Sequence, residues 1–166
     1  MLRRGASALA LVAAAVWLGG LVALGVIVAP TIFTLVSMPA SADAMTMVFR
    51  RFDVVAMSCA AIVLTTEAVR ALGRIRFARI DHARAATSVL AAAAAVFEGA
   101  SVSPRIAALH AAGAVRGRGA EGLELDRLHH TAELLGKTEV LLLVAVILLH
   151  VLSWGGEDRQ GARDAK

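Results

Sequence analysis

The sequence predicts an all-α membrane protein: a four-transmembrane-helix bundle with a short helical hairpin in its outer connection. Hydrophobic residues occupy 58% of the 166 positions, and the mean hydropathy of +0.73 is far above that of soluble proteins. Four apolar runs are each long enough to cross the hydrocarbon core, which takes about 20 helical residues. Helices are expected because lipid offers no partners to the backbone groups of an isolated strand. The length fits a single domain over residues 1–155.

The first run covers residues 6–36 and begins after Arg3 and Arg4. These arginines and the later Ala42-Asp43-Ala44 would also suit a signal peptide with its cleavage site. However, the run is about twice as long as the 7–15 apolar residues of a signal. We therefore expect a retained first transmembrane helix, in which Gly19 and Ala23 allow close packing and Trp17 lies between helices.

The other three runs cover residues 45–72, 84–103 and 132–154. The third consists mostly of alanine and contains Glu98, so it is expected to span only when flanked by other helices. If it did not span, the C-terminus would lie outside. The connection over 104–130 starts with Pro104 and shows helical spacing on both sides of "RGRGAEG", which predicts the hairpin. Residues 156–166 form a polar tail.

Arginine placement predicts that both termini are cytoplasmic. The connection between the first and second runs carries no arginine. The connection between the second and third runs carries five: Arg70, Arg74, Arg76, Arg79 and Arg84. Positive residues concentrate on the cytoplasmic side, and Arg3 and Arg4 place the N-terminus there as well. The excess of 17 basic over 13 acidic residues thus suits a multi-pass protein of the cell membrane, in a bacterium the inner membrane, and not a nucleic-acid-binding protein.

Ionisable residues at membrane depth are the main candidates for function, because they are costly there. The predicted topology places six of them in the outer half of the bundle, with three charges of each sign: Arg50, Arg51, Asp53, Glu98, Glu133 and Lys137. They would form either a pocket for a small solute or ion, or a structural ion-pair network that ties the helices together. Glu67, followed by Arg70, is expected near the cytoplasmic interface, with a proton relay as the alternative.

The histidines open a different class of function, a membrane redox protein that holds a metal or haem. His110, His129 and His130 share the outer connection and could form an external metal site. His150 lies inside the fourth run, but no second histidine lies at its depth to complete a haem site. Common catalytic motifs are absent, so we expect no enzyme and no cofactor. The single cysteine, Cys59, is expected to be a small apolar core residue.

Short motifs resemble the transmembrane-protein-205-like family of small four-helix membrane proteins. "WLGGLVALGVIVAPTIF" is similar to the first helix of that family, and "VFRRFD", "SVSPRIAALH" and "LDRLHH" resemble later segments. The matching positions are Trp17, Gly19, Gly20, Ala29, Pro30, Phe33, Phe49, Pro104, Leu128 and His129. The Ser and Asn that often follow Leu-His in the family are missing here. The resemblance implies the four-helix fold but no agreed reaction or ligand.

Together these observations predict a non-enzymatic membrane bundle that contacts lipid. Its expected role is the handling of a small solute or ion, or tolerance of envelope stress, with the metal- or haem-binding redox protein as the alternative. A homo-oligomer or a complex with another membrane protein is compatible with the sequence.

Overall fold

The computed structural model describes residues 2–72 and 78–164, with side chains over 5–72 and 78–153. All regular elements in these ranges are helices, so the predicted all-α class is confirmed. The first crossing consists of α1 (Leu2–Ala23), the π-helix η1 (Leu24–Val28) and α2 (Ala29–Leu35), and the second of α3 (Ala40–Leu72). The third consists of α4 (Arg79–Phe97), η2 (Glu98–Val102) and α5 (Ser103–Ala111), and the fourth of α6 (Gly119–Asp164).

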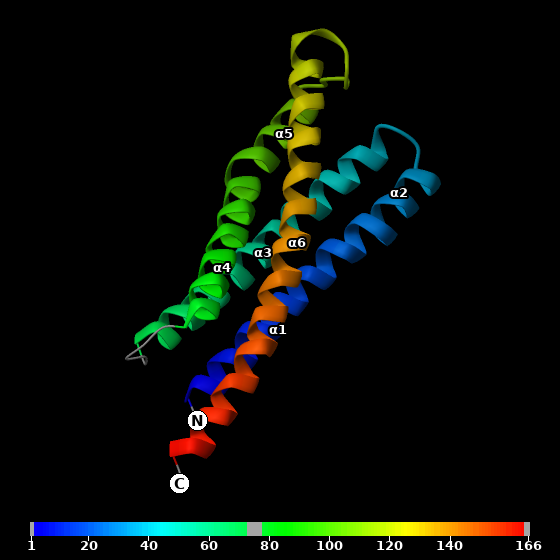
Figure 1. Ribbon diagram of the computed structural model, residues 1–166. Coiled ribbons are helices and arrows are strands. Elements are labelled where there is room, and N and C mark those ends of the chain that lie inside the picture. Colours follow the sequence, from blue (N-terminus) through cyan, green and yellow to red (C-terminus); the bar gives the residue numbers. More distant parts are fainter. Residues whose placement is uncertain (1, 73–77, 165–166) are drawn as a thin grey trace.

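The four crossings run alternately up and down, so that both termini lie at the same end of the bundle (Figure 1). We call this the proximal end and the opposite one the distal end. Helix α1 packs against α3 and α6, and α4 packs against the same two helices. Helices α1 and α4 therefore lie diagonally opposite each other, as do α3 and α6.

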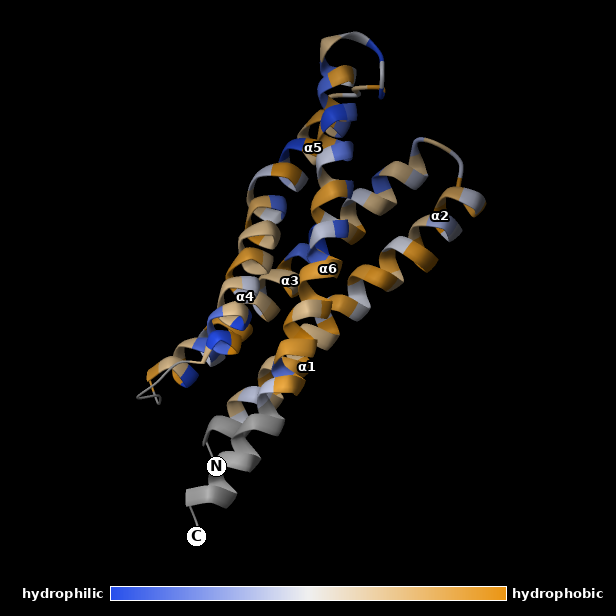
Figure 2. Cartoon of the chain, viewed as in Figure 1, coloured by the Kyte–Doolittle hydropathy of each residue, from blue (hydrophilic) through white to orange (hydrophobic). Residues whose placement is uncertain are grey.

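Each crossing is long and apolar enough to span a membrane: Gly5–Leu35, Ala40–Leu72, Arg79–Ala111 and Gly119–Ser153. Apolar residues follow the helices around their circumference, and many large ones are exposed, such as Leu9, Val12 and Val16 on α1 (Figure 2). In water such a surface would be costly, whereas in lipid it costs nothing. The chain is thus a multi-pass membrane protein, as its composition predicts.

The observed helices are longer than the apolar runs that predict them. The third crossing begins at Arg79 and continues to Ala111, and its alanine-rich part is helical throughout. The predicted hairpin is formed by the distal ends of two crossings. Helix α5 continues the third crossing, and the first turns of α6, which begins at Gly119, continue directly into the fourth. We call α5, these first turns of α6 and the turn between them the distal extension. Helix α6 also extends to Asp164, into the segment predicted as a polar tail.

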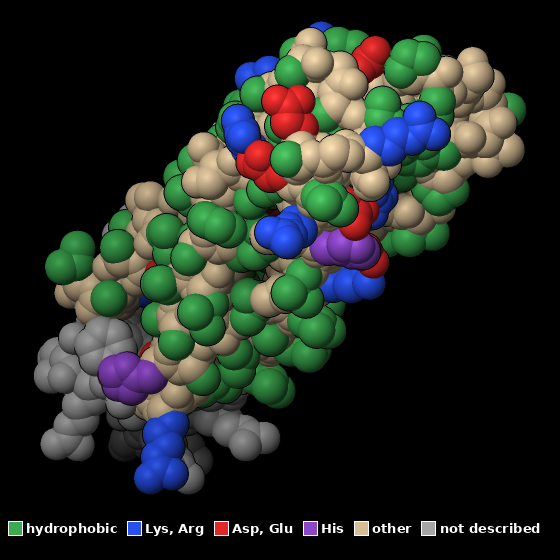
Figure 3. Space-filling view, turned by 90° about the horizontal axis from the view of Figure 1, so that it is seen from above, with side chains coloured by type: hydrophobic (Ala, Val, Ile, Leu, Met, Phe, Trp, Pro, Cys, Tyr) green, Lys and Arg blue, Asp and Glu red, His purple; other side chains and the backbone are tan. Residues whose placement is uncertain are grey.

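This distal extension has a small core of its own, formed by Val102, Ile106, Leu109 and Leu125. On its surface Arg105 donates to both carboxylate oxygens of Glu124, at 2.7 and 2.8 Å, and a second exposed ion pair links Arg116 to Asp126. Figure 3, seen from above, shows acidic and basic side chains interspersed at the surface. The extension is therefore suited to water at the membrane surface.

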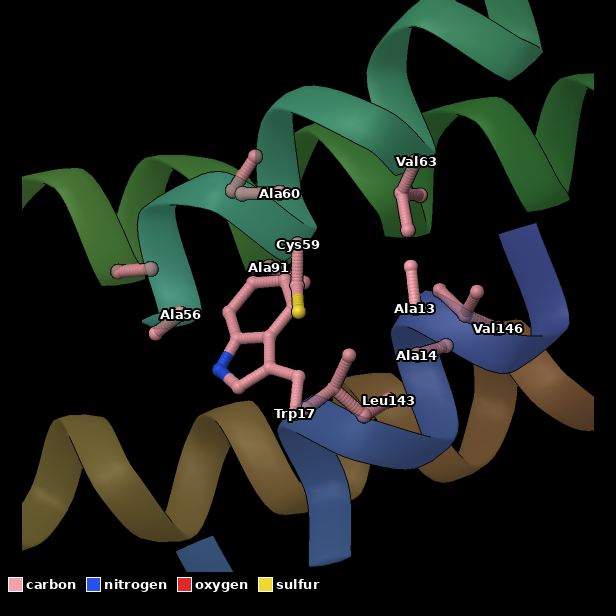
Figure 4. Packing of buried hydrophobic residues seen from close by; sticks show 12 residues of the cluster. Ala13, Ala14, Trp17, Ala56, Cys59, Ala60, Val63, Ala91, Leu143 and Val146 are labelled. Carbon is pink, nitrogen blue, oxygen red and sulfur yellow. The ribbon is translucent and has the colours of Figure 1, made fainter. Parts of the chain in front are cut away.

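The central core is built mainly from small residues around one large one. Trp17 is 1% exposed, and its indole lies beside Ala56, Cys59, Ala60 and Ala91 (Figure 4). Small side chains let membrane helices approach closely, which explains how an alanine-rich third helix fits into the bundle. The predicted positions of Trp17 between helices and of Cys59 in the core are confirmed.

The two helical hairpins repeat each other. Residues 24–32 read "LGVIVAPTI" and residues 98–106 read "EGASVSPRI", with Gly, Val, Pro and Ile at matching positions. Both segments open with a π-turn: Ala29 N–H donates to the Leu24 carbonyl and Ser103 N–H to the Glu98 carbonyl, five residues back, just before a proline. Each hairpin thus has the order helix, π-helix, proline-led helix and long helix, and α1 corresponds to its diagonal partner α4.

Close packing between α1 and α3 depends on Gly20, and not on Gly19 as the sequence suggested. A Cβ atom at Gly20 would lie 2.2 Å from Cε2 of the Phe52 ring, whereas a Cβ at Gly19 would meet nothing within 4 Å. The aromatic ring fills the space that the missing side chain leaves. Gly19 lies on the exposed side of the same helix.

We expect Gly20→Ala to destabilise the bundle by about 1–3 kcal/mol, the usual cost of an overpacked contact, because the Phe52 ring must move. The free energy of unfolding in mixed detergent micelles measures this. The matched control is Gly19→Ala, which should change stability little. Equal effects of the two substitutions would contradict this account, and Phe52→Leu should relieve the loss in Gly20→Ala.

Candidate functional site

Three acidic side chains lie inside the distal half of the bundle, on three different crossings. They are Asp53 on α3, Glu98 at the start of η2 and Glu139 on α6, and we call them the distal carboxyl cluster. Asp53 and Glu139 are buried, at 9% and 2% exposure, and Glu98 is half-buried. Glu98 interacts with both of the others, so the three carboxyls form one electrostatic unit.

Glu139 accepts a hydrogen bond from a neutral group. The indole Nε1 of Trp17 donates a hydrogen bond of 3.0 Å to Glu139 Oε2. The other oxygen, Oε1, is buried without a hydrogen-bond partner of good geometry, although the Glu98 carboxyl faces this side chain. A buried acceptor without a donor is costly, so this oxygen is a place where a proton, a cation or a water would be stabilised.

Asp53 lies at the edge of the cluster with better solvated neighbours. It interacts with the hydroxyl of Ser103 and with Arg50, one turn earlier on α3. The adjacent π-helix comes very close, since a Cβ at Gly99 would lie 3.2 Å from Asp53 Cβ. Glycine beside Glu98 therefore lets η2 bring its carboxylate against α3.

The six residues predicted as an outer-half network do not form one buried group. Asp53 and Glu98 come together, and Arg50 accompanies Asp53 from an exposed position. Arg50 and Arg51 line an open surface depression with Met47 and Val54. Glu133 and Lys137 form the expected i,i+4 ion pair at 2.6 Å, but both are exposed on the distal part of α6. Their face of α6 points away from the bundle, because residues 139, 143 and 146 point inward.

Glu139 was not among the residues predicted from the sequence, and in the cluster it takes the place expected for the Glu133–Lys137 pair. A signal was present, since Glu139 lies directly before the longest apolar stretch of the fourth run. It lies two turns before Val146 on the same buried helix face. An unpaired acid at that position is the same kind of observation that pointed to Glu98.

A second group of charged residues is buried near the proximal end, and we call Glu67, Arg70, Asp81, Arg84 and His150 the proximal ion cluster. Arg84 donates to both oxygens of Glu67, at 2.7 and 3.0 Å, and to Asp81 Oδ1 at 2.9 Å. His150 Nε2 lies 3.2 Å from Glu67 Oε1. Arg70 Nη2 donates to Ser153 Oγ at 3.4 Å. These contacts join α3 to α4 through Arg84, and α3 to α6 across the bundle through His150 and Arg70.

This cluster changes the interpretation of two earlier expectations. Glu67 was expected at the interface, but it is only 8% exposed and holds a bidentate ion pair. Arg70 and Arg84, two of the five arginines assigned to the cytoplasmic loop, are buried within the bundle. Arg74 and Arg76 lie outside the described residues. The side chains of Arg3 and Arg4 also lie outside them.

Two of the histidines in the distal extension are neighbours. The rings of His110 and His129 meet edge to face, with centroids 5.7 Å apart, while His130 lies 3.8 Å from Asp126. Among the side chains described, those of residues 5–72 and 78–153, no three His, Cys, Asp or Glu are arranged to hold a metal ion. His150 is the histidine at membrane depth, and it faces a glutamate.

We expect Glu67→Gln to destabilise the protein by about 3–5 kcal/mol, as is usual when one partner of a buried ion pair is removed. The reason is that Arg84 would keep its charge in the interior with Asp81 as its remaining acid. The free energy of unfolding in mixed micelles measures the loss. Glu133→Gln, which breaks an exposed pair, is the control and should leave stability unchanged. A comparable loss in both variants would contradict the assignment.

Comparison with known proteins gives one match. Residues 12–114, from α1 to the end of the third crossing, match the family described as a domain of unknown function, DUF4149. No curated protein and no solved structure matches the chain. The matched region includes Trp17, Asp53, Glu98 and the glutamate–arginine pair, and it ends before α6. Because it covers more than half of the chain, this multi-pass membrane protein belongs to the DUF4149 family.

Proposed function

We propose that this protein handles protons, and that it binds them inside the membrane at the carboxyl pair of Glu98 and Glu139. The observation that carries the proposal is the contact between two carboxyls of which one, Glu139, is almost fully buried. Two carboxylates repel each other strongly in a medium of low dielectric constant. A single proton between them replaces this repulsion by a charge-assisted hydrogen bond.

The surroundings favour a proton over a metal ion. The indole of Trp17 occupies one oxygen of Glu139, which leaves Oε1 as its open acceptor. A divalent metal would require several oxygen or nitrogen ligands in a fixed geometry. Asp53, with Ser103 and the exposed Arg50 beside it, supplies a route from the cluster toward the surface.

The proposal narrows the solute or ion handling expected from the sequence to the proton, without an enzymatic reaction. It includes the finer expectations as well. The arginine-rich α3–α4 connection supports cytoplasmic termini in a bacterial inner membrane, and the first-helix motif supports a relationship to transmembrane-protein-205-like proteins. Once proton binding has been measured, tolerance of envelope stress is the physiological role to test. The protein would act as a homo-oligomer or together with another membrane protein.

Labelling with dicyclohexylcarbodiimide tests the carboxyl pair. This apolar reagent dissolves in the bilayer and reacts with protonated carboxyl groups. In the detergent-solubilised protein at neutral pH, we expect Glu98 or Glu139 to be labelled many times more than Glu133, which is ionised and paired with Lys137. Peptide mass spectrometry locates the adduct.

Two variants sharpen this experiment. Glu98→Gln removes one acid and offers an amide donor to Glu139, so labelling at position 139 should fall. Glu133→Gln should leave the labelling of the pair unchanged, and size-exclusion chromatography confirms that each variant folds. If wild-type protein reacts at neither Glu98 nor Glu139, the pair holds no proton and the proposed function is wrong.

A further inference from the structure

The proximal ion cluster contains a second group that is placed to take up a proton, the imidazole of His150. The ring is fully buried, and its Nδ1 lies 2.9 Å from the Val146 carbonyl oxygen. A carbonyl only accepts hydrogen bonds, so Nδ1 must carry a hydrogen. In the neutral ring, Nε2 then keeps its lone pair and is the basic atom.

Nε2 is buried close to a carboxylate oxygen, although the two atoms make no hydrogen bond of good geometry. It lies 3.2 Å from Glu67 Oε1, and both oxygens of Glu67 already accept hydrogen bonds from Arg84. Glu67 is therefore ionised and has no hydrogen to offer. A lone pair this close to a carboxylate oxygen is repelled by it, whereas a second N–H on the ring would be attracted to it as a charge-assisted contact.

Every helix around His150 contributes a polar or charged group. The acids Glu67 and Asp81 and the guanidinium groups of Arg70 and Arg84 come from α3 and α4. These four charges sum to zero, so uptake of a proton by His150 gives the cluster one net positive charge. From α6 comes Ser153, and the described side chains of α1 contribute the hydroxyl of Ser7.

Two buried hydroxyls at the same depth have no hydrogen-bond partner within the described residues: those of Ser7 and Ser88, at 0% and 1% exposure. Ser7 lies ten residues before Trp17, and Ser88 ten residues before Glu98. His150 lies eleven residues after Glu139. Glu139 contacts Trp17 and Glu98, and both of these residues lie on crossings antiparallel to α6. Ser7, Ser88 and His150 therefore each lie about 15 Å along the helix axes from the level of the distal carboxyl cluster. Buried hydroxyls without partners are ordinarily satisfied by internal water.

The two polar layers are separated by a short apolar plug. Along α6 the buried face reads Glu139, Leu143, Val146 and His150, over about 16 Å. Around Leu143 and Val146 the neighbouring helices present mostly alanine, together with Cys59 and Val63 (Figure 4). A few water molecules in line would bridge this distance, and small side chains obstruct them least.

We propose that His150 is the proximal proton-binding group of this protein, and that it exchanges protons with the distal carboxyl cluster through a transient chain of water. This inference rests on the proposed function. In the transfer, the O–H bond of the Glu98–Glu139 pair breaks and both side chains are left as carboxylates, until a proton from water on the distal side protonates the pair again. The proton travels through water, an N–H bond forms at Nε2, and the imidazolium then releases the proton to water at the proximal end. The proton gradient drives the net movement.

Proton flux in vesicles is the direct test. Purified full-length protein is reconstituted in phosphatidylcholine vesicles that contain a pH-sensitive dye, and a potassium gradient with valinomycin provides the driving voltage. We expect wild-type flux clearly above that of protein-free vesicles, and His150→Gln should reduce it to the protein-free level. His130→Gln, on the exposed face of the distal extension, is the matched control and should keep full flux.

Two further measurements separate this inference from the proposed function. Carbodiimide labelling of Glu98 or Glu139 should persist in His150→Gln, because the distal carboxyl cluster is unchanged. Labelling without any wild-type flux would overturn the proximal site and leave the distal one intact. Loss of labelling in the wild type would overturn both.

Nitrogen-15 NMR gives a readout that needs no change at position 150. A variant that keeps His150 as its only histidine should show a ring that gains a second proton on acidification, with Glu67→Gln altering the signal. The paired substitution Ser7→Ala with Ser88→Ala should slow flux several-fold while the protein stays folded. A His150 ring that never becomes doubly protonated, or full flux in His150→Gln, would overturn the inference.

Discussion

Lipid offers no hydrogen-bond partner, so a charged side chain between the ends of these helices must find its partner inside the bundle. The arrangement of polar groups follows from this constraint. The proximal cluster satisfies it with ion pairs, in which Arg84 binds Glu67 through two parallel hydrogen bonds. The distal cluster satisfies it incompletely, because three acids share one indole donor, one hydroxyl and an exposed arginine.

The two clusters differ in how their charges are matched: the proximal ion cluster is paired, whereas the distal carboxyl cluster lacks matching bases. A buried ion pair with all its atoms matched holds two helices together, and here the Glu67–Arg84 pair joins α3 to α4. Removing it is costly, but its presence alone says little about function. A buried acid without a matching base, by contrast, costs stability and offers nothing to packing. Such a residue is best explained by a ligand, and the smallest ligand for a carboxylate pair is a proton.

The sequence predicted the fold well because hydropathy depends on residue type alone. Four apolar runs were enough to identify four helices, and Trp17 and Cys59 lie in the core as expected. The site was predicted only in part, since it depends on which faces of the helices meet. Asp53 and Glu98 were identified, but Glu133 and Lys137 attracted attention because they form a pair, and that pair is exposed. The bidentate Glu67–Arg84 contact joins residues of two different helices, α3 and α4, and spacing along one helix cannot reveal it.

The repeated hairpin also allows matching positions of the first and third crossings to be compared within one chain. Leu24 occupies in η1 the place that Glu98 occupies in η2, while Gly25 and Gly99, and Pro30 and Pro104, keep the backbone the same. In the same register Ala10 corresponds to Arg84 and Ala14 to Ser88, all of them buried. At these positions the third crossing therefore holds the polar or charged group and the first crossing supplies apolar packing. The chain thus contains an internal reference for Glu98 and Arg84: the same backbone without the charge already exists in its first crossing.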